Sequence, residues 1–147
     1  MSESVDIVVI GGGPIGLAFA LAAHAQGRRV VVLEANIGAA SDTRTLALAA
    51  GSRLILGDLG AWPSDLPATP INTIHVTQRG GFGQSILHSR EFYVPALGYT
   101  LSYRALVIAL LAQAERNQLE ITDGATVNHV ATTSDEGMVQ YVRNGVE

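Results

Sequence analysis

The chain has 147 residues, of which 48% are hydrophobic and 15% are charged, with a net charge of −4 and no cysteine. This length suits one domain of about 100–150 residues with a packed core. Because nucleic-acid binding depends on clustered Lys and Arg, the acidic balance argues against that class of function. The lack of cysteine excludes disulfides, thiolate metal sites and a cysteine nucleophile.

The first stretch, from Val5 to Glu34, predicts a strand, a glycine-rich turn, a helix and a second strand. An apolar run leads into Gly11-Gly12-Gly13-Pro14-Ile15-Gly16, and a second apolar run, Val30-Val31-Val32-Leu33, precedes Glu34. Between them, a helix is expected over residues 15–26, with Gly27 as its stop. Apolar residues fall on nearly every side of this helix, which predicts packing between the sheet and other elements.

The glycine turn has the residue types that a dinucleotide pyrophosphate requires. Gly11 and Gly13 lack a Cβ, so the backbone can turn sharply and phosphates can approach its N–H groups. Gly16 allows the helix to lie close to the sheet, and Pro14 suits a first helical turn, which does not use its missing N–H. The helix N-terminus then supplies an anion site without any basic side chain.

Glu34 ends the second strand at about the interval of 20 residues expected for an acid that binds an adenosine ribose. A carboxylate there accepts hydrogen bonds from ribose hydroxyls and repels a 2′-phosphate. Since strand, turn, helix and terminal acid agree, the stretch predicts dinucleotide binding. The alternative is an ordinary βαβ unit with a glycine-rich turn.

The segment from Ile7 to Ala23 carries no charge, which raises the question of a membrane span or signal peptide. It is shorter than the roughly 20 apolar residues of a spanning helix, and glycines and Pro14 interrupt it. The residues before it are acidic, whereas a signal peptide would begin with basic residues. We therefore expect a soluble, cytoplasmic protein.

Beyond Glu34, a loop of small residues is expected up to Ala40, followed by a helix capped by Ser41 or Asp42. Its apolar residues would be Leu46, Leu48, Leu54 and Leu56.

The pattern changes at Ile71, where apolar and polar residues alternate. Residues 71–77 predict a half-buried strand, Arg79 to Gly83 a turn, and three short strands are expected after it, at residues 85–88, 91–94 and 98–101. This block is typical of an antiparallel insertion rather than of a continued βαβ array.

The last third predicts an amphipathic helix and a hairpin. Ser102 is the expected N-cap of a helix over residues 103–117. A short strand over residues 119–122, a turn at Asp123-Gly124, and a β hairpin over residues 125–143 follow.

Three blocks together resemble one family, the FAD-dependent ubiquinone-biosynthesis hydroxylases, which are aromatic monooxygenases of the same broad class as para-hydroxybenzoate hydroxylase. The first block, residues 6–17, is shared by many two-dinucleotide-binding flavoproteins. The second is Asp42-Thr43-Arg44-Thr45-Leu46-Ala47-Leu48. The third, from Ala68 to Gly80 (ATPINTIHVTQRG), is much narrower and carries the specific resemblance.

The resemblance implies an α/β, Rossmann-like FAD-binding fold with a parallel sheet and a β hairpin, in residues 1–70 and 98–147. Residues 71–97 would begin an antiparallel substrate-domain insertion. Such enzymes are much longer, and two later flavin motifs, an Asp-Gly pair after the hairpin and a Gly-Asp pair, are missing from these residues. We therefore expect an incomplete fold, an amino-terminal fragment.

The resemblance also implies a set of cofactor-binding residues. Arg44 would reach the phosphate and ribityl side of the flavin, Arg104 would point at the cofactor, and Val127 would pack near the adenine through its backbone. A solvated loop arginine, a solvated helix arginine and an ordinary strand valine are the alternatives. The full set is Gly11, Gly13, Pro14, Ile15, Gly16, Glu34, Ala35, Arg44, Arg104 and Val127.

The implied chemistry is reduction of FAD by NADPH or NADH and use of oxygen to hydroxylate an electron-rich, lipid-tailed phenol. Peripheral contact with the inner membrane and with other ubiquinone-biosynthesis proteins is implied as well. The sequence predicts no catalytic acid or base and no metal site, and His75 and His88 are interpreted as structural. A nicotinamide-dependent dehydrogenase and a non-catalytic dinucleotide-binding module are the alternative functions.

Overall fold

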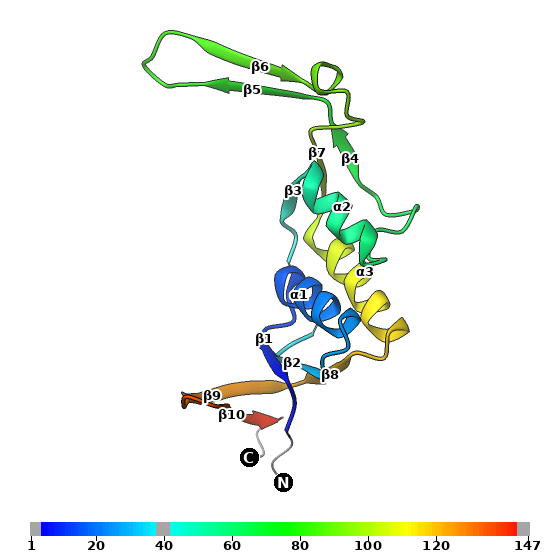
Figure 1. Ribbon diagram of the computed structural model, residues 1–147. Helices are drawn as coiled ribbons and strands as arrows, with labels where there is room; N and C mark the ends of the chain where they lie inside the picture. Colours follow the sequence, from blue (N-terminus) through cyan, green and yellow to red (C-terminus); the bar gives the residue numbers. More distant parts are fainter. Residues whose placement is uncertain (1–3, 38–41, 144–147) are drawn as a thin grey trace.

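The structure, a computed structural model, describes residues 4–37 and 42–143, which form an elongated α/β molecule (Figure 1). The elements in chain order are β1 (Ile7–Ile10), α1 (Pro14–Ala25), β2 (Val30–Glu34), β3 (Thr45–Ala49), α2 (Ala50–Asp58), β4 (Thr69–Ile71), β5 (Thr73–Thr77), β6 (Gln84–His88), the 3-10 helix η1 (Ser89–Phe92), β7 (Gly98–Ser102), α3 (Tyr103–Arg116), β8 (Glu120–Asp123), β9 (Ala125–Thr132) and β10 (Gly137–Arg143).

A parallel sheet with the strand order β1-β2-β8 is the centre of the fold. Ile7 pairs with Val30 and Val31 with Glu120, so β2 lies between the other two strands. Helix α1 connects β1 to β2 as predicted, and Gly27, at φ +77°, follows the end of that helix. This Rossmann-like arrangement confirms the predicted fold class.

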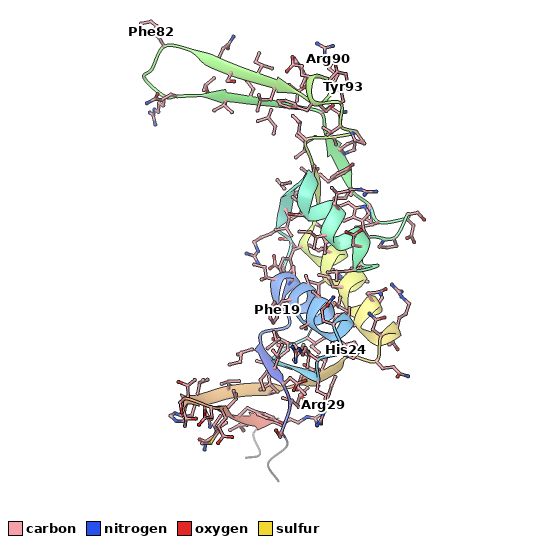
Figure 2. All side chains as sticks on the ribbon, viewed as in Figure 1. Phe19, His24, Arg29, Phe82, Arg90 and Tyr93 are labelled. Atoms are coloured by element: carbon pink, nitrogen blue, oxygen red, sulfur yellow. The ribbon has the colours of Figure 1, made fainter. Side chains whose placement is uncertain are left out.

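The hydrophobic core lies where α1 and α3 pack against each other and against the parallel sheet. Leu17 and Leu21 of α1, Val32 of β2 and Leu110 of α3 are almost completely buried. Each such side chain contributes about 1.5–3 kcal/mol when removed from water. The prediction that α1 packs on nearly every side was wrong, because Phe19 keeps 54% of its surface exposed on the outer face of that helix (Figure 2).

A second, antiparallel sheet with the order β3-β7-β4 follows the parallel one. The helix predicted to carry Leu46 and Leu48 is wrong at these residues, which belong to β3 and face inward. Alternating apolar and small residues suit a strand with one buried face, and β7 supplies the partner. Helix α2 starts later, at Ala50, without a side-chain cap. The predicted cap Ser41 lies outside the described residues.

Strands β5 and β6 form an antiparallel hairpin that projects away from the rest of the molecule (Figure 1). The prediction of a half-buried strand was wrong, since all of β5 is exposed. The strand predicted at residues 91–94 was also wrong: η1 includes the first two of these residues, and Tyr93 has a φ of +55°. The carboxylate of Glu91 accepts a hydrogen bond from the His88 N–H at 3.2 Å, which favours this tight turn over an extended strand.

Helix α3 begins as predicted, because the Ser102 hydroxyl accepts a hydrogen bond from the Ala105 N–H at 3.1 Å. Strands β9 and β10 form the predicted hairpin, with a register shift between Gln140 and Tyr141. Within residues 4–37 and 42–143, no helix combines the length and apolar character needed to cross a membrane.

Candidate functional site

The glycine turn between β1 and α1 is built so that two of its glycines cannot be replaced without strain. Gly11 has a φ of +103° and donates its N–H to the Leu33 carbonyl at 2.8 Å. A Cβ at Gly16 would lie 2.0 Å from the Gly11 carbonyl oxygen, well inside contact distance. The close passage of helix over turn, expected from the sequence, is therefore present in the structure.

The N-terminus of α1 points its free N–H groups out of this turn. Gly13 is the N-cap, with extended backbone, and Pro14 is the first helical residue. No described side chain caps this end, so the first-turn donors remain available to an anion. Ile15, the second residue of the helix, is 87% exposed.

Glu34 holds the turn from the end of the neighbouring strand. One carboxylate oxygen, Oε2, accepts the Gly12 N–H at 2.5 Å, and the other, Oε1, accepts the Asn36 N–H at 2.8 Å. Gly12 packs so closely here that a Cβ would lie 3.1 Å from the Glu34 Cβ. The acid therefore has its orientation fixed by two backbone donors, and its outer lone pairs face the space beside the turn.

A pocket of about 220 Å³ opens at this point, between the glycine turn, the end of β2 and the first half of α3. This is smaller than the roughly 300–1,000 Å³ of a complete small-molecule site and suits one part of a dinucleotide, such as a sugar with its phosphates. The lining residues are Gly12, Gly13, Glu34, Asn36, Tyr103, Arg104, Val107, Ile108 and Leu111.

The pocket brings together three of the residues predicted from the sequence, Gly13, Glu34 and Arg104, which come from three different elements. Gly11, Pro14, Ile15 and Gly16 belong to the same turn and first helical turn. Ala35 is exposed next to Glu34, and Val127 pairs with Tyr141 in the β9–β10 hairpin; both lie outside the pocket lining.

Arg44 reaches the edge of this site through Tyr103. Its guanidinium lies 4.9 Å from the centre of the Tyr103 ring, and its carbonyl accepts the Tyr103 N–H at 2.9 Å. The same guanidinium pairs with Asp42, with 2.5 Å between Nη2 and Oδ2. This hydrogen-bonded pair lowers the pKa of Asp42 and raises that of Arg44.

Sequence reasoning missed Tyr103 and the apolar floor of the pocket formed by Val107, Ile108 and Leu111. The available signal was position, since Tyr103 directly follows the Ser102 cap and precedes Arg104. In a sequence, the apolar stripe of an amphipathic helix looks the same whether it lines a pocket or packs in the core.

The site fits the diphosphate and ribose of a dinucleotide. A Cβ added at Gly11 would meet no described atom within 4 Å, so there is open space beside the turn. The adjacent pocket is lined by Gly13, Arg104 and Glu34. Backbone N–H groups and the arginine match phosphate oxygens, and the carboxylate matches ribose hydroxyls.

The histidines of the hairpin bond within the hairpin itself. His75 Nε2 lies 3.0 Å from Gln84 Oε1, and His88 Nδ1 lies 3.0 Å from Thr73 Oγ1. In the part of the chain that the structure describes, no group of three or more His, Asp and Glu residues could hold a metal ion.

Comparisons with known proteins agree with this fold. Residues 9–65 match the family model described as an NAD(P)-binding Rossmann-like domain. A p-nitrophenol 4-monooxygenase from Pseudomonas putida superposes on 99% of this chain with a TM-score of 0.79, at 20% identity and over 38% of its own chain.

Two further solved structures contain FAD. A flavin-dependent monooxygenase in complex with FAD and substrate matches 94% of this chain and 27% of its own, at 18% identity and a TM-score of 0.74. An aklavinone-11 hydroxylase with FAD and aklavinone matches 98% of this chain and 31% of its own, at 22% identity and a TM-score of 0.71. This chain thus spans well under half the length of the enzymes it matches, and it has the Rossmann-like α/β fold that they contain.

Proposed function

We propose that this chain is the nucleotide-binding part of an FAD-dependent aromatic-ring monooxygenase that uses NADPH or NADH and oxygen. The observation that carries the proposal is the convergence of the glycine turn, Glu34 and Arg104 on one pocket at the carboxyl ends of parallel strands. In open α/β sheets, dinucleotides bind at this edge of the sheet. Solved structures of the same fold are named as a flavin-dependent monooxygenase and an aklavinone-11 hydroxylase, each with FAD.

In this proposal, the residues of the chain divide the cofactor among them. The turn from Gly11 to Gly16 would hold the pyrophosphate, Glu34 with its neighbour Ala35 the adenosine ribose, and Val127 the adenine side. Arg44 and Arg104 would neutralise the phosphates. When bound, FAD would supply the redox and oxygen chemistry, and the protein would position it and exclude water.

The test is calorimetric titration of the purified chain with ADP, which represents the half of FAD that these residues would bind. Replacement of Arg104 by alanine should weaken ADP binding about tenfold, because a charge-assisted contact to phosphate is lost. Arg79→Ala, in the turn of the projecting β5–β6 hairpin, removes the same charge far from the pocket and should leave the affinity unchanged. Equal losses in both variants, or no ADP binding by the unaltered chain, would contradict the proposal.

A nicotinamide-dependent dehydrogenase is the second candidate, because the matching family model is described as NAD(P)-binding. A classical dehydrogenase domain continues directly after the ribose-binding acid with another βαβ unit. Here the chain enters the antiparallel β3, and the next strand of the parallel sheet is β8, far along the sequence. Titration with FAD and NADH of the protein that carries this chain separates the candidates: tighter binding of NADH would favour the dehydrogenase.

The substrate that we propose is a polyprenyl phenol of ubiquinone biosynthesis. Support comes from the Ala68 to Gly80 block, which resembles the ubiquinone-biosynthesis hydroxylases and, among them, most of all the 2-polyprenyl-6-methoxyphenol hydroxylases. For the full-length protein, we expect oxygen-dependent consumption of NADPH or NADH that rises with a polyprenyl phenol. It should not rise with para-hydroxybenzoate, a carboxylated phenol without a polyprenyl chain. Equal stimulation by both compounds would reject this substrate class.

The domain division that we propose assigns residues 1–70 and 98–147 to FAD binding and residues 71–97 to the start of a substrate domain. The projecting β5–β6 hairpin supports it (Figure 1). Deletion of residues 73–88, joined by a short glycine linker, should leave ADP affinity unchanged, and a large loss would contradict the division.

A lipid-tailed substrate would be taken from a bilayer, so we also propose a cytoplasmic location with peripheral contact at the inner membrane and with other proteins of the pathway. Flotation of the full-length protein with liposomes that contain the polyprenyl substrate would test this. Absence from the floating fraction would count against the contact.

A further inference from the structure

We propose that the hydroxyl of Tyr103 donates a hydrogen bond to the pyrophosphate of the bound dinucleotide, which adds a phosphate-binding residue from α3 to the glycine turn. The inference rests on the proposed function, since it needs a dinucleotide in the pocket.

The Tyr103 hydroxyl lies at the N-terminus of α1. A Cβ built on Gly13 would lie 3.3 Å from the Tyr103 oxygen, so this oxygen lies directly over the N-cap of α1. Tyr103 also lines the pocket together with Glu34 and Arg104. The hydroxyl therefore faces the space onto which the first-turn N–H groups of α1 open.

The Tyr103 hydroxyl is available to bond a ligand. Among the described residues, Tyr103 bonds through its backbone N–H to the Arg44 carbonyl and through its ring face to the Arg44 guanidinium, and its hydroxyl makes no hydrogen bond. A half-buried hydroxyl in a pocket gains free energy when a ligand supplies an acceptor.

The surroundings of the Tyr103 hydroxyl determine which ligand atom it can bond. The neighbouring groups at Gly13 are backbone donors, which cannot accept from a tyrosine hydroxyl. A ligand atom that serves both the backbone donors and the hydroxyl must therefore accept at least two hydrogen bonds. Phosphate oxygens meet this requirement, whereas ribose hydroxyls are better matched to the Glu34 carboxylate.

The Tyr103 side chain is held in place before a ligand binds. Tyr103 is the first residue of α3, capped by Ser102, and its ring supports Arg44 at 4.9 Å from the ring centre. A side chain on a capped helix turn, with its ring already in contact with a neighbour, loses less side-chain entropy on binding than a free one. The same contact places the Arg44 guanidinium, which is paired with Asp42, against the face of the ring.

The test compares ADP with adenosine in three proteins: the unaltered chain, Tyr103→Phe and Tyr99→Phe. Tyr103→Phe keeps the ring under Arg44 and removes only the hydroxyl. Tyr99→Phe makes the same change on β7, where the ring contacts Trp62 at 5.4 Å and lies outside the pocket lining. ADP affinity is measured by calorimetry and adenosine affinity by NMR titration, with the unfolding midpoint of each protein recorded.

We expect Tyr103→Phe to weaken ADP binding about tenfold while adenosine binding stays within twofold, because only ADP carries the phosphates. Tyr99→Phe should bind both ligands like the unaltered chain. Equal ADP affinity in Tyr103→Phe and the unaltered chain would overturn the inference and leave the proposed function standing. A parallel loss of ADP and adenosine affinity would also overturn it, since that pattern indicates a structural role. Failure of the unaltered chain to bind ADP would overturn both.

Discussion

The carboxylate of Glu34 accepts a hydrogen bond from the Gly12 amide at 2.5 Å, although the two residues lie 22 positions apart in the chain. The bond joins the end of β2 to the turn that follows β1. The residue that we propose binds the ribose is therefore also bonded to the turn that we propose binds the phosphates, so one substitution can disturb both.

Replacement of Glu34 by glutamine should lower the free energy of unfolding by about 1–2 kcal/mol, since the amide offers one acceptor oxygen where the carboxylate offers two. The Gly12 and Asn36 amides then cannot both be satisfied. Urea unfolding followed by circular dichroism measures the change. A loss of ADP affinity with an unchanged unfolding free energy would show that Glu34 contacts the ligand without bracing the turn.

Gly16→Ala should destabilise the protein by about 2–4 kcal/mol, because the new Cβ would lie 2.0 Å from a backbone oxygen of Gly11. Gly51→Ala is the matched control in α2, where a Cβ would meet no described atom within 4 Å. That change should stabilise the protein by about 0.4–1 kcal/mol through reduced freedom of the unfolded chain. Similar effects of the two substitutions in urea unfolding would refute the close contact at Gly16.

Asp42 gives a pH dependence whose sign follows from its ion pair. Hydrogen bonds from the side chain and the backbone N–H of Arg44 hold its pKa below the ordinary value of 3.8. The unfolded chain therefore takes up the proton first as pH falls. Any stability gained from the pair is complete above the unfolded pKa and is lost as pH falls through the lower folded pKa. The difference in unfolding free energy between the unaltered protein and Asp42→Asn should accordingly vanish at acidic pH, and a difference that grows there would contradict the pair.

The same substitution should strengthen ADP binding, since Arg44 is then without its carboxylate partner. At low ionic strength we expect a two- to threefold gain, which decreases as salt screens the exposed guanidinium. Calorimetric titration at low and high salt measures it. Unchanged affinity at low salt would mean that Arg44 does not reach the phosphates.

Asp123 secures the segment that follows Glu34, because its Oδ1 accepts from the Ile37 and Gly124 N–H groups, each at 2.9 Å. Asp123→Ala should speed hydrogen exchange of the Ile37 amide about tenfold, since an exposed bond of about 1 kcal/mol or slightly more is lost. Asp123→Asn retains an acceptor oxygen and should exchange like the unaltered protein. Equal exchange in the alanine variant would show that other contacts hold this segment.

The βαβ unit could be predicted from sequence because each of its signals is local. The apolar runs, the glycines and the terminal acid all lie within residues 5–34, and the structure confirms the elements they predict. The strand β3 could not be identified in this way. Its five residues are compatible with a helix or a strand, and the partner that decides between them, β7, lies far along the sequence, at Gly98–Ser102.

The relation between Arg44 and Tyr103 was equally inaccessible. The contact depends on strand register, because Thr45 pairs with Ser102. This pairing places Arg44, which precedes Thr45, next to Tyr103, which follows Ser102. A sequence shows that two strands exist and leaves open which residues face each other. The predicted pocket residues are glycines and charged residues, whose types already suggest ligand binding. Tyr103 and the apolar residues of α3 were missed, because only their neighbours in the fold place them in a pocket.

Strand β1 has a further consequence for solutions of this chain by itself. It pairs with β2 on one edge, and no described strand covers the other. Its residues, Ile7 to Ile10, include no charge or proline, the devices that normally protect a sheet edge. The opposite edge, β8, carries Glu120 and Asp123. We therefore expect concentrated solutions to aggregate by strand addition at β1, and a lysine in place of the exposed Val8 to suppress it. The strand that leads into the glycine turn is thus also an edge at which another copy of this chain can pair.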